Sequence, residues 1–276
     1  MNIGFIIDSE TLPPDLELVL QESKKSQNYN ISLIISYSIV ADSKKNFFQK
    51  VIKSLHTMGL LKSINKFFLK LIFLMESKLL KKHELELLSK DELNIHKAGV
   101  PILRLKPIYS KSKVIVSFSD NDLETIKSKK LDFIIRGGHH ILRGGILEVC
   151  PYGVIGMHHG DNEVYRGLPS GFWEVYNQDL NSGFIIQRLQ EVLDQGIVYF
   201  KGYIESKETA YKNSLYIHQK ARKEFIIFIE NFAKSGKLPK VIEGNGDIAK
   251  LTTIPTIKQQ IKYLWRVHIK SNINFL

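Results

Sequence analysis

The chain has 276 residues, 43% of them hydrophobic, which supports one large folded domain, with or without an extension, and argues against global disorder. A single cysteine excludes an internal disulfide. The first residues lack the basic and apolar regions of a signal peptide, so we expect a cytoplasmic protein. The formal net charge of +11 raises the question of a nucleic-acid partner, which depends on where the charge lies.

Runs rich in Ile, Val and Leu alternate with helical patterns along residues 1–205. Near-continuous apolar runs of this kind are typical of parallel strands that are buried on both faces. We therefore predict an α/β, Rossmann-like domain with a mostly parallel sheet and helices on both faces. The predicted strands lie at residues 2–8, 31–38, 100–105, 131–138, 153–158 and 182–189, and helices are predicted at 13–25 and 120–130.

Residues 44–90 interrupt this alternation and are predicted to form a basic helical insertion. Within it, residues 44–82 hold ten lysines and one acid, and so carry +9 of the net charge. The basic character is therefore local, which argues against a nucleic-acid partner that binds across the fold. The amphipathic part is too short and too charged to span a bilayer. Three interpretations stay open: packing on the domain or in a homodimer, contact with an anionic membrane surface, and a nucleic-acid patch.

Residues 206–276 are predicted to form a C-terminal helical extension. Apolar residues recur at three- and four-residue steps from 211 to 232, and Gly236 and Pro239 then end the helix. His218 lies on this apolar stripe, so we interpret it as a core histidine. A second helix is predicted within residues 257–270. Nothing in this part resembles the Arg-rich, aromatic surface of a tRNA-binding domain.

The polar stretch GMHHGDNEVYRG, at residues 156–167, follows a predicted strand. His158 is followed eight residues later by Arg166 and Gly167, and 36 residues later by Asp194. Between them, Gly183 opens an apolar strand, and Gly196 comes two residues after Asp194. This joint spacing resembles the 10-formyltetrahydrofolate-dependent formyltransferases, which act on glycinamide ribonucleotide, methionyl-tRNA or sugar nucleotides.

The resemblance implies a function and a set of site residues. The chain would transfer a formyl group from 10-formyltetrahydrofolate to the amine of a small acceptor, for which we expect an amino sugar on a nucleotide. His158 and Asp194 would be catalytic, and Arg166 and Gly167 would bind the acceptor. The residues implied to bind the folate are Gly138, His139, His140, Ile141, Leu142 and Leu193.

The chemistry of formyl transfer suits these residue types. The reaction passes through a tetrahedral intermediate whose oxyanion needs hydrogen-bond donors, and a proton must move from the attacking amine to the leaving nitrogen. A histidine is able to donate to the oxyanion and to exchange a proton near neutral pH, and a carboxylate beside it fixes the tautomer. No metal is predicted, because the two His-His pairs lack the spacing of common zinc motifs.

Gly156 departs from the family pattern, which has Asn two residues before the histidine. The amide of that Asn is implied to hold the oxyanion, and Gly has no side chain. His159 and Asn162 are candidate replacements, although consecutive strand residues face opposite sides, which weakens the case for His159. Two further alternatives stay open: a methionyl-tRNA formyltransferase, and a catalytically weakened formyltransferase-like binding protein.

Overall fold

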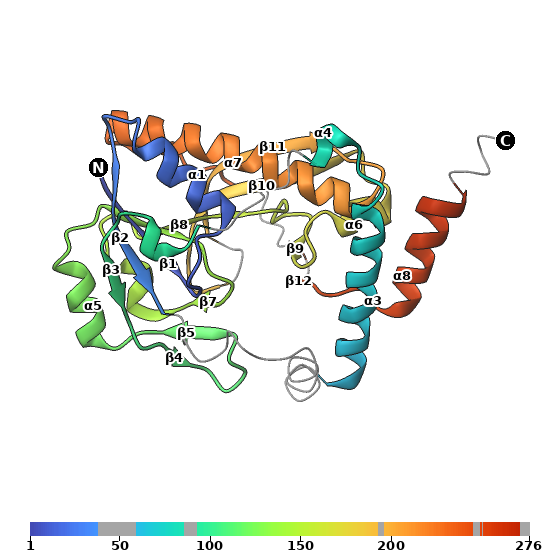
Figure 1. The fold of residues 1–276 in the computed structure, drawn as a ribbon, viewed down its shortest axis with the longest axis horizontal. Coiled ribbons are helices and arrows are strands. Elements are labelled where there is room, and N and C mark those ends of the chain that lie inside the picture. Colours follow the sequence, from blue (N-terminus) through green and yellow to red (C-terminus); the bar gives the residue numbers. More distant parts are fainter. Residues whose placement is uncertain (38–58, 86–92, 193–195, 245–248, 250, 271–276) are drawn as a thin grey trace.

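The computed structural model describes residues 1–37, 59–85, 93–192, 196–244, 249 and 251–270 of the chain (Figure 1). Its centre is a seven-stranded sheet in which β8, β6, β1, β2 and β3 run parallel, while β10 and β11 are antiparallel to their neighbours. In spatial order the strands are β11 (Ile197–Glu205), β10 (Asn181–Arg188), β8 (Val154–His158), β6 (Phe133–Arg136), β1 (Asn2–Ile7), β2 (Asn30–Ser36) and β3 (Ile102–Arg104).

Helices cover both faces of this sheet. On one face, α1 (Pro14–Ser23) and α7 (Ala210–Ser235) bury apolar side chains such as Leu16 and Phe225 against Phe5 and Ile155. On the other face, α5 (Asp120–Lys127) and the short helix η3 (Gly144–Glu148) pack over a second core. This is the predicted Rossmann-like α/β arrangement. Because α7 shares the core of the sheet, residues 210–235 pack as part of that domain.

Short strands build two smaller sheets that our sequence analysis did not predict. One joins β4 (Ile108–Tyr109), β5 (Ile115–Ser117) and β7 (Ile141–Leu142), and the other pairs β9 (Arg166–Gly167) with β12 (Leu251–Thr252). Strands of two or three residues are too short to show alternation in a sequence. A short helix, η2 (Ile95–Lys97), precedes β3.

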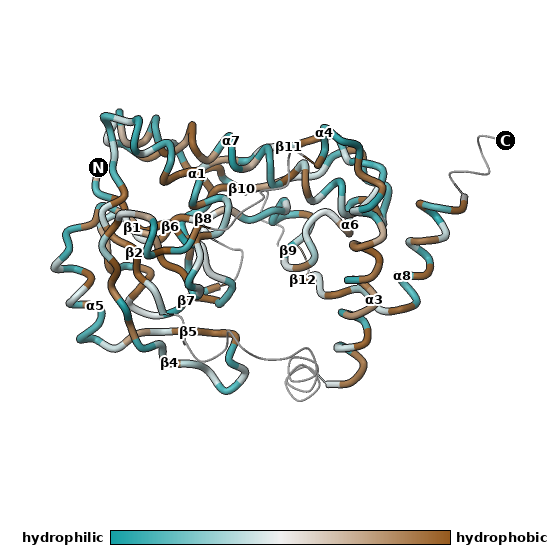
Figure 2. The backbone as a smooth tube through the Cα atoms, in the orientation of Figure 1, coloured by the Kyte–Doolittle hydropathy of each residue, from teal (hydrophilic) through white to brown (hydrophobic). Residues whose placement is uncertain are grey.

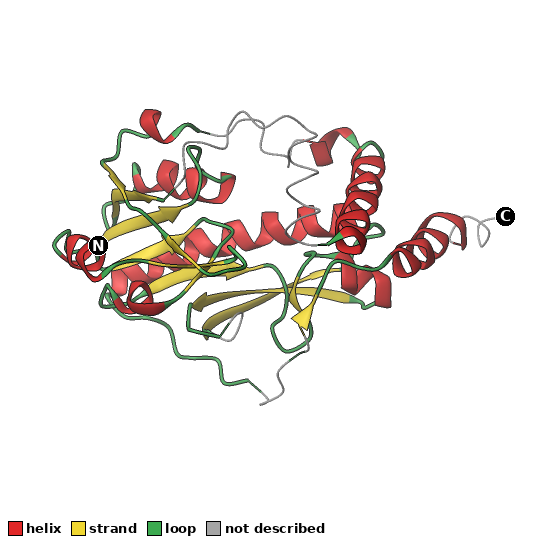
Figure 3. Ribbon diagram, turned by 90° about the horizontal axis from the view of Figure 1, so that it is seen from below, coloured by secondary structure: helices red, strands yellow, loops and turns green. Residues whose placement is uncertain are grey.

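A helical unit stands at the end of the molecule opposite α5 (Figures 1 and 3). It combines α3 (Leu60–Ser77) and α4 (Lys82–Leu85), both within the predicted insertion, with α6 (Phe172–Asn177), α8 (Ile257–Leu264) and the π-helical segment η4 (Trp265–Lys270). Leu69 and Ile72 of α3 pack with Phe172 and Tyr263. Glu76 is buried there and accepts hydrogen bonds from the Tyr263 hydroxyl and from the backbone N–H of Tyr211.

Glu174 of α6 gives this unit a pH-dependent stability. It is 3% exposed, and burial raises the pKa of its carboxyl to about 7, from the usual 4.5 of an exposed Glu. The folded chain therefore binds more protons than the unfolded chain between these values, so the free energy of unfolding falls as the pH rises. We expect Glu174→Gln to remove this fall and to add up to about 3 kcal/mol above pH 7. Urea unfolding at pH 5 and pH 8 measures it, and exposed Glu124→Gln is the control. A variant that gains no stability at pH 8 would contradict the expectation.

Candidate active site

Three neighbouring strands bring polar side chains to one face of the sheet. The register pairs Gln187 of β10 with Gly156 of β8, and Ile135 of β6 with Ile155, so Arg136 lies beside Gly156 on the other side. Since side chains alternate along a strand, His158 faces the same way as position 156. Arg136, Gly156 and Gln187 thus form a row across the sheet, with His158 at the carboxyl end of β8.

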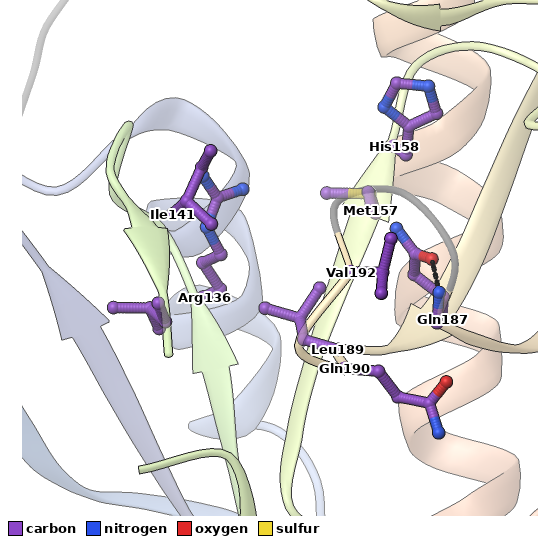
Figure 4. Close-up of a pocket in the computed structure, with 10 residues that line it drawn as sticks. Arg136, Ile141, Met157, His158, Gln187, Leu189, Gln190 and Val192 are labelled. Carbon is purple, nitrogen blue, oxygen red and sulfur yellow. Dashed lines mark hydrogen bonds between the residues drawn. The ribbon is translucent and has the colours of Figure 1, made fainter. Parts of the chain in front are cut away.

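A pocket opens on this face (Figure 4). Arg136 enters it from β6, and His158 and Gln187 enter it from β8 and β10. The other lining residues are Ile141, Leu142, Met157, Leu189, Gln190, Val192 and Gly196. A pocket outside the carboxyl end of parallel strands is where ligands bind in open α/β sheets.

The loop after β8 folds back over His158. The His158 Nε2 atom lies 3.4 Å from the carbonyl oxygen of Tyr165. A Cβ atom at Gly160 would lie 3.0 Å from this Nε2, so a larger residue would press on the imidazole ring. Asp161 anchors this loop to β11. It is buried, accepts a hydrogen bond from the Tyr203 hydroxyl at 2.7 Å, and pairs with Lys201.

Asp194 and Leu193 lie outside the described residues, so their predicted roles stay predictions. The structure does describe Gly196, whose backbone N–H donates to Gln187 Oε1 at 3.0 Å. A Cβ atom at Gly196 would lie 2.1 Å from the carbonyl oxygen of Arg188, so only glycine fits there. The Gly two residues after Asp194 is therefore needed for close backbone approach beside the pocket.

The space left by Gly156 lies between Arg136 and Gln187, two polar residues that the sequence analysis missed. A Cβ atom built at position 156 meets nothing closer than Arg136 Cβ at 3.6 Å and Leu189 Cδ2 at 3.9 Å, so a side chain fits there. Gln187 is 1% exposed, and Figure 4 shows its amide nitrogen directed away from the Gly196 bond, toward β8. The side-chain amide of Gln187 thus borders the position of the missing Asn, whereas the guanidinium of Arg136 donates to the carbonyl oxygen of His140 at 3.0 Å.

His159 lies on the opposite face of the sheet, as strand alternation requires. Its ring stacks on His218 of α7 with centroids 3.6 Å apart, and burial, with nearby positive groups, holds its pKa well below the usual value. It does not line the pocket. Asp15 lies within 4.8 Å of both histidines, but its carboxylate pairs with Arg222, so we interpret this cluster as packing. Asn162, in the loop, is not a lining residue either.

The predicted folate loop divides into two parts. Ile141 and Leu142 line the pocket, whereas Gly138, His139 and His140 surround Asp8 at the end of β1. The backbone N–H of His139 donates to the Asp8 carboxylate at 2.7 Å, and His140 Nδ1 lies 2.9 Å from it. Burial alone would raise the pKa of Asp8, but its interactions with His139 and His140 lower it to about 2. The loop is therefore held by an ionised carboxylate.

Arg166 and Gly167 lie in β9, outside the lining of the pocket. Gly167 has a φ of +99°, and a Cβ atom there would lie 2.4 Å from the carbonyl oxygen of Thr252. The glycine of this pair is thus required by the pairing of β9 with β12. Their predicted role in binding the acceptor stays a prediction.

Solved formyltransferases share this fold. Phosphoribosylglycinamide formyltransferase from Bacillus halodurans is 14% identical with a TM-score of 0.55, covering 86% of this chain and 97% of that one. A sugar N-formyltransferase from Shewanella sp. FDAARGOS_354 is 13% identical with a TM-score of 0.51, covering 96% and 87%. No protein-family model matches the sequence, and neither does any curated protein sequence. The chain therefore has the formyltransferase fold.

Proposed function

We propose that this protein transfers a formyl group from 10-formyltetrahydrofolate to the amine of a small acceptor, an amino sugar carried on a nucleotide. The observation that carries the proposal is the position of His158 at the carboxyl end of β8, on the face where Arg136 and Gln187 border the pocket. The shared fold and the spacing from His158 to Asp194 support it.

The residues of the pocket divide the chemistry between them. The acceptor amine attacks the formyl carbon, and donors beside position 156 stabilise the oxyanion that forms. His158 takes part in moving a proton from the attacking nitrogen to the leaving nitrogen of the folate. Asp194 orients the imidazole and stabilises its charged form. The amine itself is the nucleophile, so no covalent enzyme intermediate is needed.

A folate titration tests the co-substrate. We expect 5-formyltetrahydrofolate, a stable analogue, to bind at the pocket and to give heat in calorimetry. Ile141→Arg should weaken it by at least about tenfold, because Ile141 is half-buried and lines the pocket, so the charged side chain would enter it. The exposed Leu180→Arg, outside the pocket, is the matched control. Equal affinity in both variants would place the folate elsewhere.

A turnover assay tests the acceptor. We expect formyl transfer to at least one member of a panel of nucleotide-linked amino sugars, and Asp194→Asn should lower kcat by about a hundredfold or more. Methionyl-tRNA in the same panel tests the alternative acceptor. Folate binding with no transfer to any acceptor would favour the other alternative, a catalytically weakened formyltransferase-like binding protein.

A further inference from the structure

Helix α3 turns its most apolar side toward solvent. Leu60, Phe67, Leu71 and Leu74 recur at helical spacing along one line, and all are more than 40% exposed. Leu61, Phe68 and Met75 lie beside this line and are exposed as well. The side that α3 buries against α7 and α8 is narrower, with Leu69, Ile72 and Glu76. An apolar stripe of this length is uncommon on the surface of a soluble monomer.

Helix α8 and segment η4 also expose apolar side chains, and they lie next to α3. Asn65 of α3 contacts the start of α8 through Ile257, while Glu76, further along α3, contacts Tyr263 and His268. The two helices therefore run side by side in the same direction. Ile261, Trp265 and Ile269 follow one another at four-residue steps, with exposed fractions of 61%, 49% and 51%. Figure 2 shows hydrophobic colour along both helices.

Exposed cations flank this apolar surface. The two acids in residues 59–85, Glu76 and Glu84, are 1% and 2% exposed, and residues 251–270 contain no acid. Among the described residues, the face therefore offers no exposed negative charge. The exposed basic residues of α3, α4 and α8 and of their flanking residues include Lys62, Lys66, Lys70, Lys78, Lys81, Lys82, Lys258 and Lys262.

This combination decides among the three interpretations that the sequence left open. A nucleic acid would pair with the lysines but would offer no apolar layer for the exposed Leu, Phe and Ile side chains. A second copy docked on the same face would bring two positive surfaces together, with no exposed acid to offset them. An anionic bilayer offers both an apolar layer for the exposed side chains and negative headgroups for the lysines. No helix in the described ranges is long and apolar enough to cross a membrane, so contact through this face would be interfacial.

We propose that α3, α8 and η4 form a docking face for the surface of an anionic lipid bilayer. Leu71, Leu74 and Phe67 insert at the level of the headgroups, and Lys66 and Lys70 contact the lipid phosphates. The inference goes beyond formyl transfer and involves no residue of the pocket. It is therefore tested on the full chain without folate or acceptor.

Co-sedimentation with vesicles tests the proposal. We expect the full chain to bind vesicles of equal parts phosphatidylcholine and phosphatidylglycerol, and to bind pure phosphatidylcholine far more weakly. Lys66→Gln/Lys70→Gln should weaken binding by about thirtyfold, because each lysine near an anionic surface contributes to affinity. Leu71→Gln/Leu74→Gln should weaken it by at least about tenfold.

Matched controls lie on the exposed side of α7. Ile227 is 53% exposed and Lys223 is exposed, so Ile227→Gln and Lys223→Gln remove the same chemistry elsewhere and should leave binding unchanged. Circular dichroism confirms that each variant is folded. Absence of binding to the anionic vesicles, or equal losses in the controls, would overturn the proposal. A dimer in solution that Leu71→Gln/Leu74→Gln dissociates, without vesicle binding, would assign the face to a second copy.

Discussion

Replacing His158 by Asn is expected to lower kcat by two to four orders of magnitude while folate affinity stays within about twofold. The imidazole stands at the end of β8 and borders the pocket without filling it. It acts on a proton and on charge that exist only during the reaction, so ground-state binding should hardly change. Asn keeps a polar group of similar reach but is unable to carry the proton.

The measurement pairs steady-state turnover with calorimetric titration of 5-formyltetrahydrofolate. His96→Asn is the control, since the side chain of His96 is 61% exposed and does not line the pocket. If His158→Asn retained more than about a tenth of the rate, His158 would not be the proton carrier. If folate binding were lost as well, the residue would serve to build the pocket.

Much of the fold followed from the sequence because parallel strands are buried on both faces. The apolar runs at residues 131–138 and 153–158 correspond to β6 and β8, and the polar residues that follow them meet at one sheet edge as expected. Strand β11 was not predicted. Its exposed edge mixes polar and apolar residues, and such a strand gives a weak periodic signal.

Gln187 shows why the site was less predictable than the fold. In the sequence it is one polar residue in an apolar strand. Only the antiparallel pairing of β10 with β8 places it directly across from Gly156. Register depends on tertiary packing and is not encoded in a short run of residues. By contrast, simple alternation already argued that His159 faces away from His158, and its ring lies against α7.

A second large effect is expected at Gln187. In the family pattern the residue at position 156 supplies a side-chain amide. Here the amide of Gln187 comes from the neighbouring strand, β10. Losing one oxyanion donor typically lowers the rate by a factor of a hundred to a thousand. We therefore expect Gln187→Leu to lower kcat by about a hundredfold. Arg136→Met, measured in parallel, tests the neighbour on β6, whose guanidinium donates to the His140 carbonyl.

Gln187 also accepts the Gly196 N–H, so a loss of rate alone would be ambiguous. The double variant Gln187→Leu/Gly156→Asn separates the two roles, because position 156 has room for a side chain and Asn restores the amide from β8. Rescue of kcat by at least about tenfold would show that the amide is the donor. If the double variant stays slow and folate affinity has fallen, Gln187 instead positions the segment at Gly196. Full activity of Gln187→Leu would leave Arg136 or a backbone N–H as the group that replaces the missing Asn.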